Sequence, residues 1–269
     1  MIELNKIYNM DCVEGMKQID ESVIDLIVTS PPYNVGIQYD SWDDLMPWAD
    51  YLDWCRRWLT ECFRVLKDDG RICVNHMIQI NPVKSKENHV RFPIFDLMNI
   101  MNQIGYQVKF LSVWDDLTIP KQTAWGSWKS ASSPYLSSPY EGVIIACKKY
   151  WTKLSKGEST ISKEDFMEGC SGVWHIGTTT GLTMANFPEK LPQLCIDLFS
   201  YKGDTVLDPF SGSGTTCYVA KGLERKYIGF EISEAYYNAS LSRLLGAPYK
   251  VVPNTNPYGR KEISKETLW

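Results

Sequence analysis

The sequence predicts an α/β protein built on a mostly parallel sheet with helices on both faces. Short apolar runs alternate along the chain with stretches of helical periodicity, the pattern of parallel strands joined by crossover helices. The 269 residues, 44% of them apolar, allow a full core with roughly 73% of the unfolded surface buried on folding. The 22% of charged residues is ordinary for a globular protein and excludes disordered or collagen-like chains.

The helices and strands can be placed in order along the chain. Residues 25–29, with Leu26, Ile27 and Val28 at their centre, predict a buried strand, which stops at Pro31 because proline cannot donate to a strand ladder. Residues 47–67 carry apolar side chains on one helical face, and a strand at 71–75 follows a turn at Asp69-Gly70. Further helices are expected at 92–103, 191–199, 214–222 and 234–245, and further strands at 108–113, 142–147, 205–207 and 227–232.

Two long segments interrupt this alternation, at 115–140 and 148–186. The first is rich in Ser, Pro and Trp and the second in Gly, Thr and Lys, and long loops in compact domains are usually functional or disordered. From 121 to 156 the chain carries six lysines and one acid, a local charge of +5 in a protein of net charge −4. A basic segment on an acidic body suits contact with a polyanion, although a solvated loop with chance charges explains the excess equally well.

The chain shows no sign of a metal site, a disulfide framework or a membrane segment. No two of the eight cysteines are separated by only two residues and the three histidines are far apart, which predicts free thiols and no bound metal. No apolar run reaches the length of about 18 residues that a spanning helix needs. The first residues lack a basic start followed by an apolar stretch, so we expect a cytoplasmic protein without a secretory signal.

A glycine-rich loop at 208–216 lies between the strand at 205–207 and the next helix. Such a loop presents backbone N–H groups and a helix N-terminus to an anionic group. No Lys-Ser/Thr pair follows the glycines, which excludes a nucleoside-triphosphate loop, and the carboxylate of Asp208 would repel a pyrophosphate. Asp208 suits an ammonium group instead, and Glu231, 19 residues beyond Gly212, stands where an acid binds both hydroxyls of a ribose. The pattern predicts a site for an amino-acid nucleoside, S-adenosylmethionine, and the alternative is a plain strand-to-helix turn.

A second polar segment, Ser30-Pro31-Pro32-Tyr33, follows the first predicted strand. Polar residues at the carboxyl end of a strand lie at the ligand-binding edge of an open α/β sheet. Two consecutive prolines fix the backbone and hold their carbonyl acceptors in a rigid arc, which suits an amino group that must give up hydrogens. Tyr33 adds an aromatic face on which a planar base can stack. Taken alone, the segment is also compatible with a Pro-Pro turn beside a core tyrosine, but the glycine-rich loop favours the catalytic interpretation.

These motifs resemble those of the β-class S-adenosylmethionine-dependent DNA amino-methyltransferases. In that class the catalytic motif comes first, the target-recognition region second and the cofactor motif last, and here Ser30 precedes Asp208 by 178 residues. Methyltransferases of protein glutamine or of RNA carry a similar motif after the glycine loop, the reverse of this order. Residues 9–12 resemble the family segment that contacts the cofactor adenine, and residues 187–192 the segment before the cofactor strand. The cofactor-binding residues implied are Asp11, Cys12, Ser30, Lys190, Asp208, Pro209, Phe210, Ser211, Gly212, Ser213, Gly214, Thr215, Thr216, Glu231 and Ile232.

The resemblance covers roughly residues 1–246 and implies a Rossmann-like S-adenosylmethionine-dependent methyltransferase fold. The implied sheet is mostly parallel and twisted, with helices on both faces, one antiparallel strand and a circularly permuted order of motifs. We expect a single methyltransferase domain over 1–269. Within it, 1–113 form the catalytic half, 114–186 the loops with the target-recognition region, 187–246 the cofactor-binding half and 247–269 a C-terminal tail.

The resemblance implies direct methyl transfer to an exocyclic amino group of a flipped DNA base, without a covalent enzyme–base intermediate. The Ser30 hydroxyl and the Pro31 carbonyl would accept the amino hydrogens and favour a pyramidal nitrogen, while Tyr33 would stack on the base. In this family Ser at the first motif position is associated with N4 of cytosine and Asp with N6 of adenine. We therefore predict cytosine N4 as the target and keep adenine N6 as the alternative. The predicted catalytic residues are Ser30, Pro31, Pro32 and Tyr33.

Contacts with double-stranded DNA are expected from the two long loops. The stretch from Trp125 to Glu141 resembles the family's target-base loop, and the lysines of both loops can bind phosphates and position the duplex. No helix-turn-helix or zinc-finger pattern is present, so the recognised sequence cannot be read. The predicted DNA-binding residues are Lys121, Trp125, Ser127, Trp128, Lys129, Lys148, Lys149 and Lys153.

Two other classes of protein could use the same scaffold. A non-catalytic DNA-binding protein would have lost the catalytic or the cofactor motif, and both are intact. An S-adenosylmethionine-dependent enzyme acting on RNA or a small molecule is disfavoured by the order of the motifs and by the basic, tryptophan-rich loops. The resemblance favours a prokaryotic or phage DNA methyltransferase of a restriction–modification system. A cognate restriction endonuclease is a candidate partner, and a homodimer is a candidate assembly.

Overall fold

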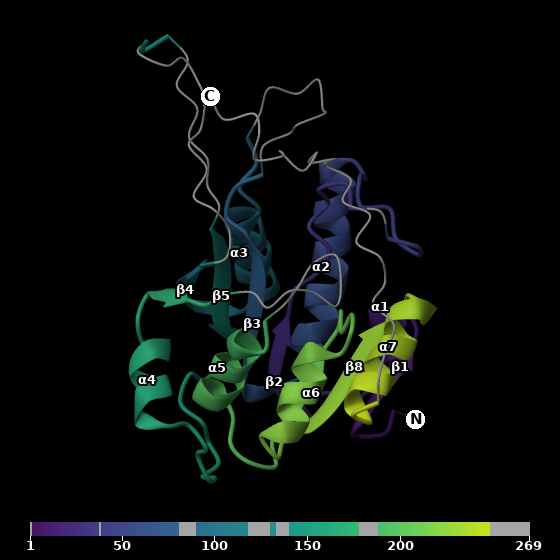
Figure 1. Ribbon diagram of the computed structural model, residues 1–269, viewed down its shortest axis with the longest axis vertical. Helices are drawn as coiled ribbons and strands as arrows, with labels where there is room; N and C mark the ends of the chain where they lie inside the picture. Colours follow the sequence, from purple (N-terminus) through teal and green to yellow (C-terminus); the bar gives the residue numbers. More distant parts are fainter. Residues whose placement is uncertain are drawn as a thin grey trace, which may run out of the picture.

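The computed structural model describes residues 2–37, 39–80, 90–117, 130–132, 140–177 and 188–247, and the structural statements below concern these residues. Within them, one sheet contains strands in the order β1-β8-β7-β2-β3-β5-β4-β6 (Figure 1). Neighbouring strands are parallel except that β5 runs antiparallel to both β3 and β4. The predicted mostly parallel sheet with one antiparallel strand is confirmed. The strands are β1 (Lys6–Asn9), β2 (Ile24–Thr29), β3 (Leu66–Met77), β4 (Gln107–Asp115), β5 (Glu141–Cys147), β6 (Val173–His175), β7 (Thr205–Asp208) and β8 (Lys226–Glu231).

Helices cover both faces of the sheet, as predicted. On one face α2 contacts α1 and α3 over a core that includes Trp58, and on the other α6 contacts α5 and α7 over a core that includes Trp174. Figure 1 shows α2 and α3 behind the sheet and α5 and α6 in front of it. No helix in the described part of the chain is both long and apolar enough to span a membrane. The helices are α1 (Cys12–Met16), α2 (Trp48–Val65), α3 (Pro93–Ile104), α4 (Lys163–Gly169), α5 (Lys190–Phe199), α6 (Thr215–Gly222) and α7 (Glu234–Leu244).

The central strand β2 shows why both faces are covered. All six of its residues are buried. Successive side chains of a strand point to opposite faces, and Ile27 joins the core beneath α2 while Leu26 and Val28 join the core beneath α5 and α6. A strand that reads as one continuous apolar run therefore needs helices on both sides of the sheet.

Several expectations about local structure are wrong. No turn precedes the third strand at Asp69-Gly70, because β3 begins at Leu66 and runs through both residues to Met77. Its pairing with β2 is irregular at this point, so the turn signal marks a bulge inside the strand. The segment 148–186, expected to be a loop, contains α4 and β6. These two elements, like β1 and α1, span three to seven residues, too few for a periodic pattern to be recognised.

Gly214, at the start of α6, is expected to be intolerant of any side chain. Its φ of 79° lies in the left-handed region, and a side-chain carbon built there would lie 2.9 Å from Cβ of Ser240 on α7. Gly214→Ala should lower the free energy of unfolding by about 2 kcal/mol, through backbone strain and this contact, and lower Tm by about 5 °C. Gly222→Ala is the matched control, since its added carbon meets nothing within 4 Å. Equal Tm values for the two variants, measured by calorimetry, would contradict the argument.

Candidate active site

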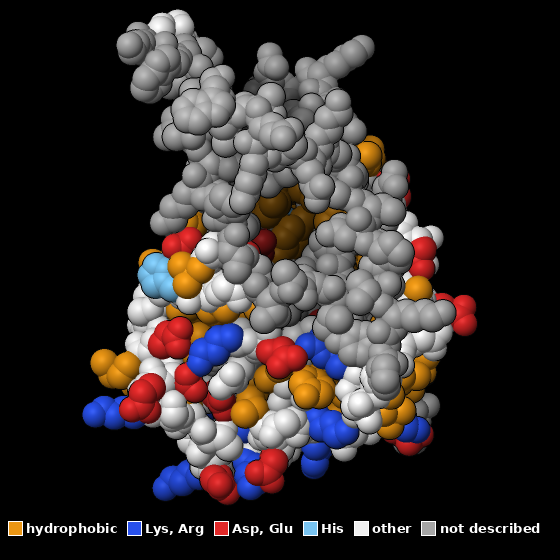
Figure 2. All heavy atoms as spheres, viewed as in Figure 1, with side chains coloured by type: hydrophobic (Ala, Val, Ile, Leu, Met, Phe, Trp, Pro, Cys, Tyr) orange, Lys and Arg blue, Asp and Glu red, His pale blue; other side chains and the backbone are white. Residues whose placement is uncertain are grey.

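A cavity of about 410 Å³ lies at the carboxyl ends of the parallel strands. Ser30 follows β2, Asp208 ends β7 and Glu231 ends β8, so three neighbouring strands deliver polar side chains to one edge of the sheet. All of the segment 30–33 lines the cavity, together with most of the glycine-rich loop. In Figure 2 the face turned to the viewer is hollowed, with hydrophobic side chains inside the hollow.

The two prolines of the catalytic segment have different surroundings. The Pro32 carbonyl accepts a hydrogen bond of 2.7 Å from the hydroxyl of Tyr51 on α2, and this hydroxyl also hydrogen-bonds His76 Nε2 at 2.8 Å. The described residues provide no hydrogen bond to the Pro31 carbonyl. The expectation that both carbonyls are free acceptors is therefore wrong for Pro32, and the acceptors open to a ligand are Pro31 and Ser30.

Ser30 and Tyr33 belong to a hydrogen-bonded cluster with Asn75 and Glu141. The Tyr33 hydroxyl lies 2.9 Å from Ser30 Oγ and donates to Glu141 Oε2 at 2.7 Å. Asn75 Nδ2 donates to the Tyr33 hydroxyl at 2.6 Å and to Glu141 Oε2 at 2.5 Å. Burial raises the pKa of Glu141 above its ordinary value, although these hydrogen bonds oppose the shift. The Tyr33 ring stacks on His76 with centroids 4.2 Å apart, and Tyr33 also lines the cavity.

Glu141 reaches this cluster because β5 is antiparallel. It is the first residue of β5, and an antiparallel strand starts at the edge where the parallel strands end. In the sheet it lies opposite Met77 of β3 and Trp114 of β4. Neither Asn75 nor Glu141 was among the predicted catalytic residues. The rule that polar residues at strand ends face the ligand identifies Asn75, and identifies Glu141 only once the direction of β5 is known.

The loop after the catalytic segment is held by the buried carboxylate of Asp44. Its two oxygens accept hydrogen bonds from four successive backbone N–H groups, those of residues 34–37, at 2.8 to 3.0 Å. Gly36 has a left-handed φ of 85°, which helps to turn these N–H groups inward. Further along the loop, Asp40 accepts a 2.8 Å hydrogen bond from Ser233, and both residues line the cavity. Asp44 thus fixes the chain that borders the cavity between the catalytic segment and α7.

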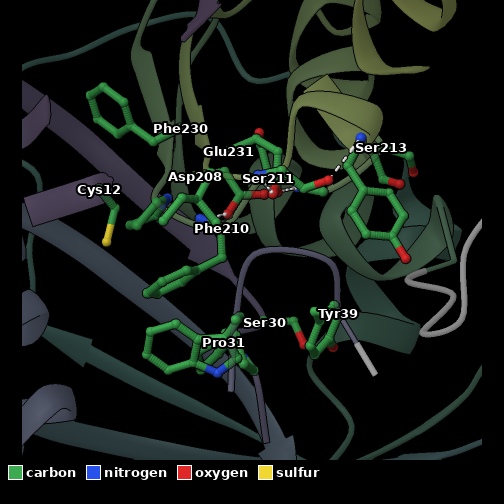
Figure 3. Close-up of a pocket in the computed structure, with 18 of the residues that line it drawn as sticks. Cys12, Ser30, Pro31, Tyr39, Asp208, Phe210, Ser211, Ser213, Phe230 and Glu231 are labelled. Carbon is green, nitrogen blue, oxygen red and sulfur yellow. Dashed lines mark hydrogen bonds between the residues drawn. The ribbon is translucent and has the colours of Figure 1, made fainter. Parts of the chain in front are cut away.

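Two acids tie the glycine-rich loop to its neighbours. Asp208 Oδ1 accepts hydrogen bonds from the Thr29 hydroxyl at 2.7 Å and from the Phe210 N–H at 3.1 Å. Glu231 Oε2 accepts from the Gly212 N–H at 2.8 Å. Burial raises the pKa of Asp208 to about 6 and the pKa of Glu231 to about 7, although the hydrogen bonds oppose both shifts. In Figure 3 the two acids lie in the middle of the pocket.

Among the described residues, Arg243 is the only lysine or arginine that lines the cavity. This arginine of α7 is buried and pairs with Glu189 at 2.6 Å. Lys190, expected to bind the cofactor, does not line the cavity, because its ammonium pairs with Asp165 and Glu168 of α4. We therefore correct the prediction: Arg243, and not Lys190, is the cation that can meet a ligand carboxylate. Nothing in the sequence distinguishes Arg243 from an exposed helical arginine.

The lining of the cavity fits the parts of S-adenosylmethionine. Two acids and one arginine match an ammonium, ribose hydroxyls and a carboxylate, and the buried Ser211 Oγ has no hydrogen-bond partner in the described part of the chain. Cys12, Phe210 and Phe230 gather on one side of the pocket in Figure 3, where an apolar wall suits a purine. Apart from Lys190 and Gly214, every residue predicted to bind the cofactor lines the cavity. They are Asp11, Cys12, Ser30, Asp208, Pro209, Phe210, Ser211, Gly212, Ser213, Thr215, Thr216, Glu231 and Ile232.

Cys12 and Cys73 are unsuited to act as nucleophiles toward a base. Burial raises the pKa values of the Cys12 and Cys73 thiols well above the ordinary value for cysteine. A thiol in that state carries little of the thiolate that attacks a base. Neither thiol is therefore suited to form a covalent bond with a base.

Three lysines expected to bind DNA phosphates have structural roles instead. Lys148 is buried, and its ammonium donates to backbone carbonyls at and just before the start of β3. The ammonium of Lys153 lies 3.4 Å from Asp25 and 3.1 Å from Asp204, at the amino ends of β2 and β7, and Lys149 pairs with an acid of β3. All three lie at the sheet edge opposite the cavity, so the prediction is wrong for them. The other predicted DNA-binding residues, Lys121, Trp125, Ser127, Trp128 and Lys129, lie outside the described residues.

The fold and the cavity define the class of protein: an α/β chain whose strand ends border a cavity that fits S-adenosylmethionine and contains the segment 30–33. A family model described as DNA methylase, covering N6 and N4 enzymes, matches residues 24–242. The chain therefore belongs to the N6/N4 DNA methylase family, and the predicted resemblance to β-class amino-methyltransferases is confirmed. It is a DNA methyltransferase of this family, acting on DNA.

Curated relatives and solved structures agree with this assignment. The type II methyltransferase M.MjaVI of Methanocaldococcus jannaschii is 43% identical over 151 residues, which cover 56% of this chain and 75% of that protein. M.BamHI of Bacillus amyloliquefaciens is 29% identical over 286 residues, 99% of this chain and 66% of that protein. Among solved structures, TTHA0409 of Thermus thermophilus, complexed with S-adenosyl-L-methionine, has a TM-score of 0.73 at 24% identity. The match covers 90% of this chain and 93% of TTHA0409. The cytosine-N4-specific PvuII DNA methyltransferase has a TM-score of 0.70 at 21% identity, and the match covers 88% of this chain and 85% of the PvuII enzyme. At these identities the structures support the fold.

Proposed function

We propose that the protein transfers a methyl group from S-adenosyl-L-methionine to N4 of cytosine in double-stranded DNA. The observation that supports this most directly is the single cavity that the catalytic segment 30–33 shares with Asp208 and Glu231. The hydrogen bond from Thr29 to Asp208 joins the two halves directly beneath it. A base amino group and a cofactor can therefore meet inside one enclosure, as direct transfer requires.

The lining of the cavity offers a partner for each polar part of the cofactor. Glu231 would accept hydrogen bonds from the ribose hydroxyls, Asp208 would pair with the ammonium, and Arg243 would donate to the carboxylate. Phe210 and Phe230 would border the adenine. The complex of TTHA0409 with S-adenosyl-L-methionine, on a similar fold, supports the same cofactor here. When bound, S-adenosyl-L-methionine supplies an already activated methyl group, so the protein has mainly to position it.

The catalytic segment would hold the target amino group. The Ser30 hydroxyl and the Pro31 carbonyl accept its two hydrogens, which directs the nitrogen lone pair away from the ring and favours attack. The same negative dipoles stabilise the positive charge that develops on nitrogen as the methyl group arrives. Tyr33, which lines the cavity, stacks on the base after the base has left the duplex.

The choice of base follows from Ser30. In this family a serine at this motif position is associated with N4 of cytosine and an aspartate with N6 of adenine. The similar fold of the cytosine-N4-specific PvuII enzyme agrees with this choice. Adenine N6 is the second candidate, because the family includes N6 as well as N4 enzymes.

The relatives also suggest the biological setting. M.MjaVI and M.BamHI are type II methyltransferases, so we propose that this chain modifies DNA within a restriction–modification system. A cognate endonuclease that cleaves the unmodified site is the partner this proposal requires, and a homodimer remains the candidate assembly.

Transfer of tritium-labelled methyl groups tests the substrate class. We expect label in plasmid DNA, and little in RNA or in a reaction without nucleic acid. Label in RNA alone would contradict the proposal. A protein that binds the cofactor but labels neither polymer would point to a small-molecule substrate and would contradict it equally.

A further inference from the structure

The hydrogens of the cluster formed by Ser30, Tyr33, Asn75 and Glu141 can be assigned from its contacts. The single hydroxyl hydrogen of Tyr33 goes to Glu141 Oε2, and Asn75 Nδ2 donates to both of these groups. The 2.9 Å contact between Ser30 Oγ and the Tyr33 hydroxyl must then use the hydrogen of Ser30. While Glu141 is ionised, Ser30 Oγ therefore presents only lone pairs to the cavity, as an amino-group acceptor should.

Methyl transfer to an amino group also releases a proton, since the nitrogen exchanges an N–H bond for an N–C bond. We propose that Ser30, Tyr33 and Glu141 form a relay that carries this proton from the methylated nitrogen to the Glu141 carboxylate. The inference rests on the proposed function, because only an amino-group substrate loses a proton at Ser30. Glu141 acts through the two hydroxyls, so it is a positioning residue and the final proton acceptor.

The relay balances atoms and charges. The nitrogen lone pair forms the new N–C bond, and the bond between methyl and sulfur breaks with its electron pair left on sulfur. One N–H bond of the methylated nitrogen then breaks, its electron pair stays on nitrogen, and its proton binds Ser30 Oγ. The original Ser30 proton moves to the Tyr33 oxygen, and the Tyr33 proton moves to Glu141 Oε2. A neutral methylamino base and a neutral carboxylic acid remain, while both hydroxyl groups are restored.

The surroundings of Glu141 suit a proton acceptor. Burial and the nearby Asp116, the residue that follows β4, raise the pKa of Glu141. From β3 it faces Asn75, which does not titrate, and beyond it His76, whose pKa burial lowers to about 3, so that this ring stays neutral. From the catalytic segment it faces Tyr33, whose pKa burial raises well above the ordinary value, so the phenol passes a proton on rather than losing one.

Protonation of Glu141 before the reaction reverses the direction of the hydrogen bonds along the relay. A neutral carboxyl donates to Tyr33, Tyr33 donates to Ser30, and the Ser30 hydrogen then points into the cavity against the amino hydrogens. The rate of transfer should therefore fall at low pH, with its midpoint above the ordinary carboxyl pKa because that of Glu141 is raised.

Glu141→Gln separates the relay from a structural role. Its amide oxygen still accepts from Tyr33 and Asn75, but it cannot take up a proton. In single-turnover transfer of labelled methyl groups to plasmid DNA at saturating cofactor, we expect a fall of ~100-fold, with the low-pH decline abolished. Tyr33→Phe, which interrupts the chain of hydroxyls, should show the same loss, and the double variant should lose no more than either alone. Asp115→Asn is the matched control, a buried acid at the same sheet edge that pairs with His175 outside the cavity, and it should keep the wild-type profile.

An infrared titration supplies a readout independent of activity. The carboxylic acid band that appears on acidification should lose one component in Glu141→Gln, with a midpoint that matches the decline in the wild-type rate. Unchanged affinity for S-adenosyl-L-methionine shows that each variant keeps its pocket. A Glu141→Gln protein with the wild-type rate and pH profile would overturn the relay and leave the proposed function intact. A wild-type protein that transfers no methyl group to DNA would overturn both.

Discussion

Ser30→Ala is expected to lower the rate of methyl transfer to DNA by about 100- to 1,000-fold at saturating cofactor. The hydroxyl and the Pro31 carbonyl are the two acceptors that the cavity offers to an amino group, since the Pro32 carbonyl already accepts a hydrogen bond from Tyr51. Its loss removes a dipole aimed at the charge that develops in the transition state, an interaction stronger there than in the bound substrate. The measurement is a single-turnover time course of labelled methyl groups entering plasmid DNA.

Ser242→Ala is the control for that variant. This serine lies on α7 and is partly exposed, and in the described structure its hydroxyl donates only to the Asn238 carbonyl, so removal of the hydroxyl should leave the rate unchanged. Ser30→Ala activity within about threefold of wild type would show that the hydroxyl does not act on the substrate. The acceptor assigned to the catalytic segment would then be wrong.

Affinity for S-adenosyl-L-methionine is expected to fall as the pH drops below about 7, the value to which burial raises the pKa of Glu231. Each Glu231 oxygen already accepts one backbone N–H, from Gly212 or Ser233, and keeps a lone pair for a ribose hydroxyl. Binding to those hydroxyls favours the ionised form, so the complex releases a proton and the dissociation constant rises up to tenfold for each pH unit below that value. Asp208, with a pKa raised to about 6, adds a second decline at lower pH.

Glu231→Gln should raise the dissociation constant by about 10- to 100-fold at pH 8, the effect of losing hydrogen bonds to a charged group. Its remaining pH dependence should begin only near pH 6, where Asp208 titrates. Glu234→Gln, an exposed acid in the first turn of α7, is the control and should bind as wild type does. Isothermal titration calorimetry across this pH range measures both values. A Glu231→Gln profile identical to that of the wild type would remove Glu231 from the cofactor site.

The parts of the site that could be predicted from sequence are those coded within a few consecutive residues. A buried strand ending at Ser30-Pro31 and a strand–glycine loop–helix at Asp208 specify their own local backbone. The topology then brings these two segments together, because β2 and β7 are neighbours in the sheet. The class of fold followed from the alternation of the same elements.

The parts that could not be predicted depend on contacts distant in sequence. Arg243 joins the cavity only because α7 packs against the glycine-rich loop, and Glu141 only because β5 reverses direction. The sequence predicted that lysines 148, 149 and 153 would contact DNA phosphates, but carboxylates and backbone carbonyls near the starts of three strands pair with their ammonium groups. Charge in the sequence is therefore a weak guide to a DNA-binding surface until the ion pairs are known.

Mass spectrometry of nucleosides from plasmid DNA methylated in cells expressing this chain tests the central claim most directly. The account predicts N4-methylcytosine, absent from cells expressing Ser30→Ala. N6-methyladenine in its place would keep the cavity and its mechanism but contradict the assignment of the base from Ser30. Unmodified DNA, from a protein that still binds S-adenosyl-L-methionine, would contradict the account as a whole.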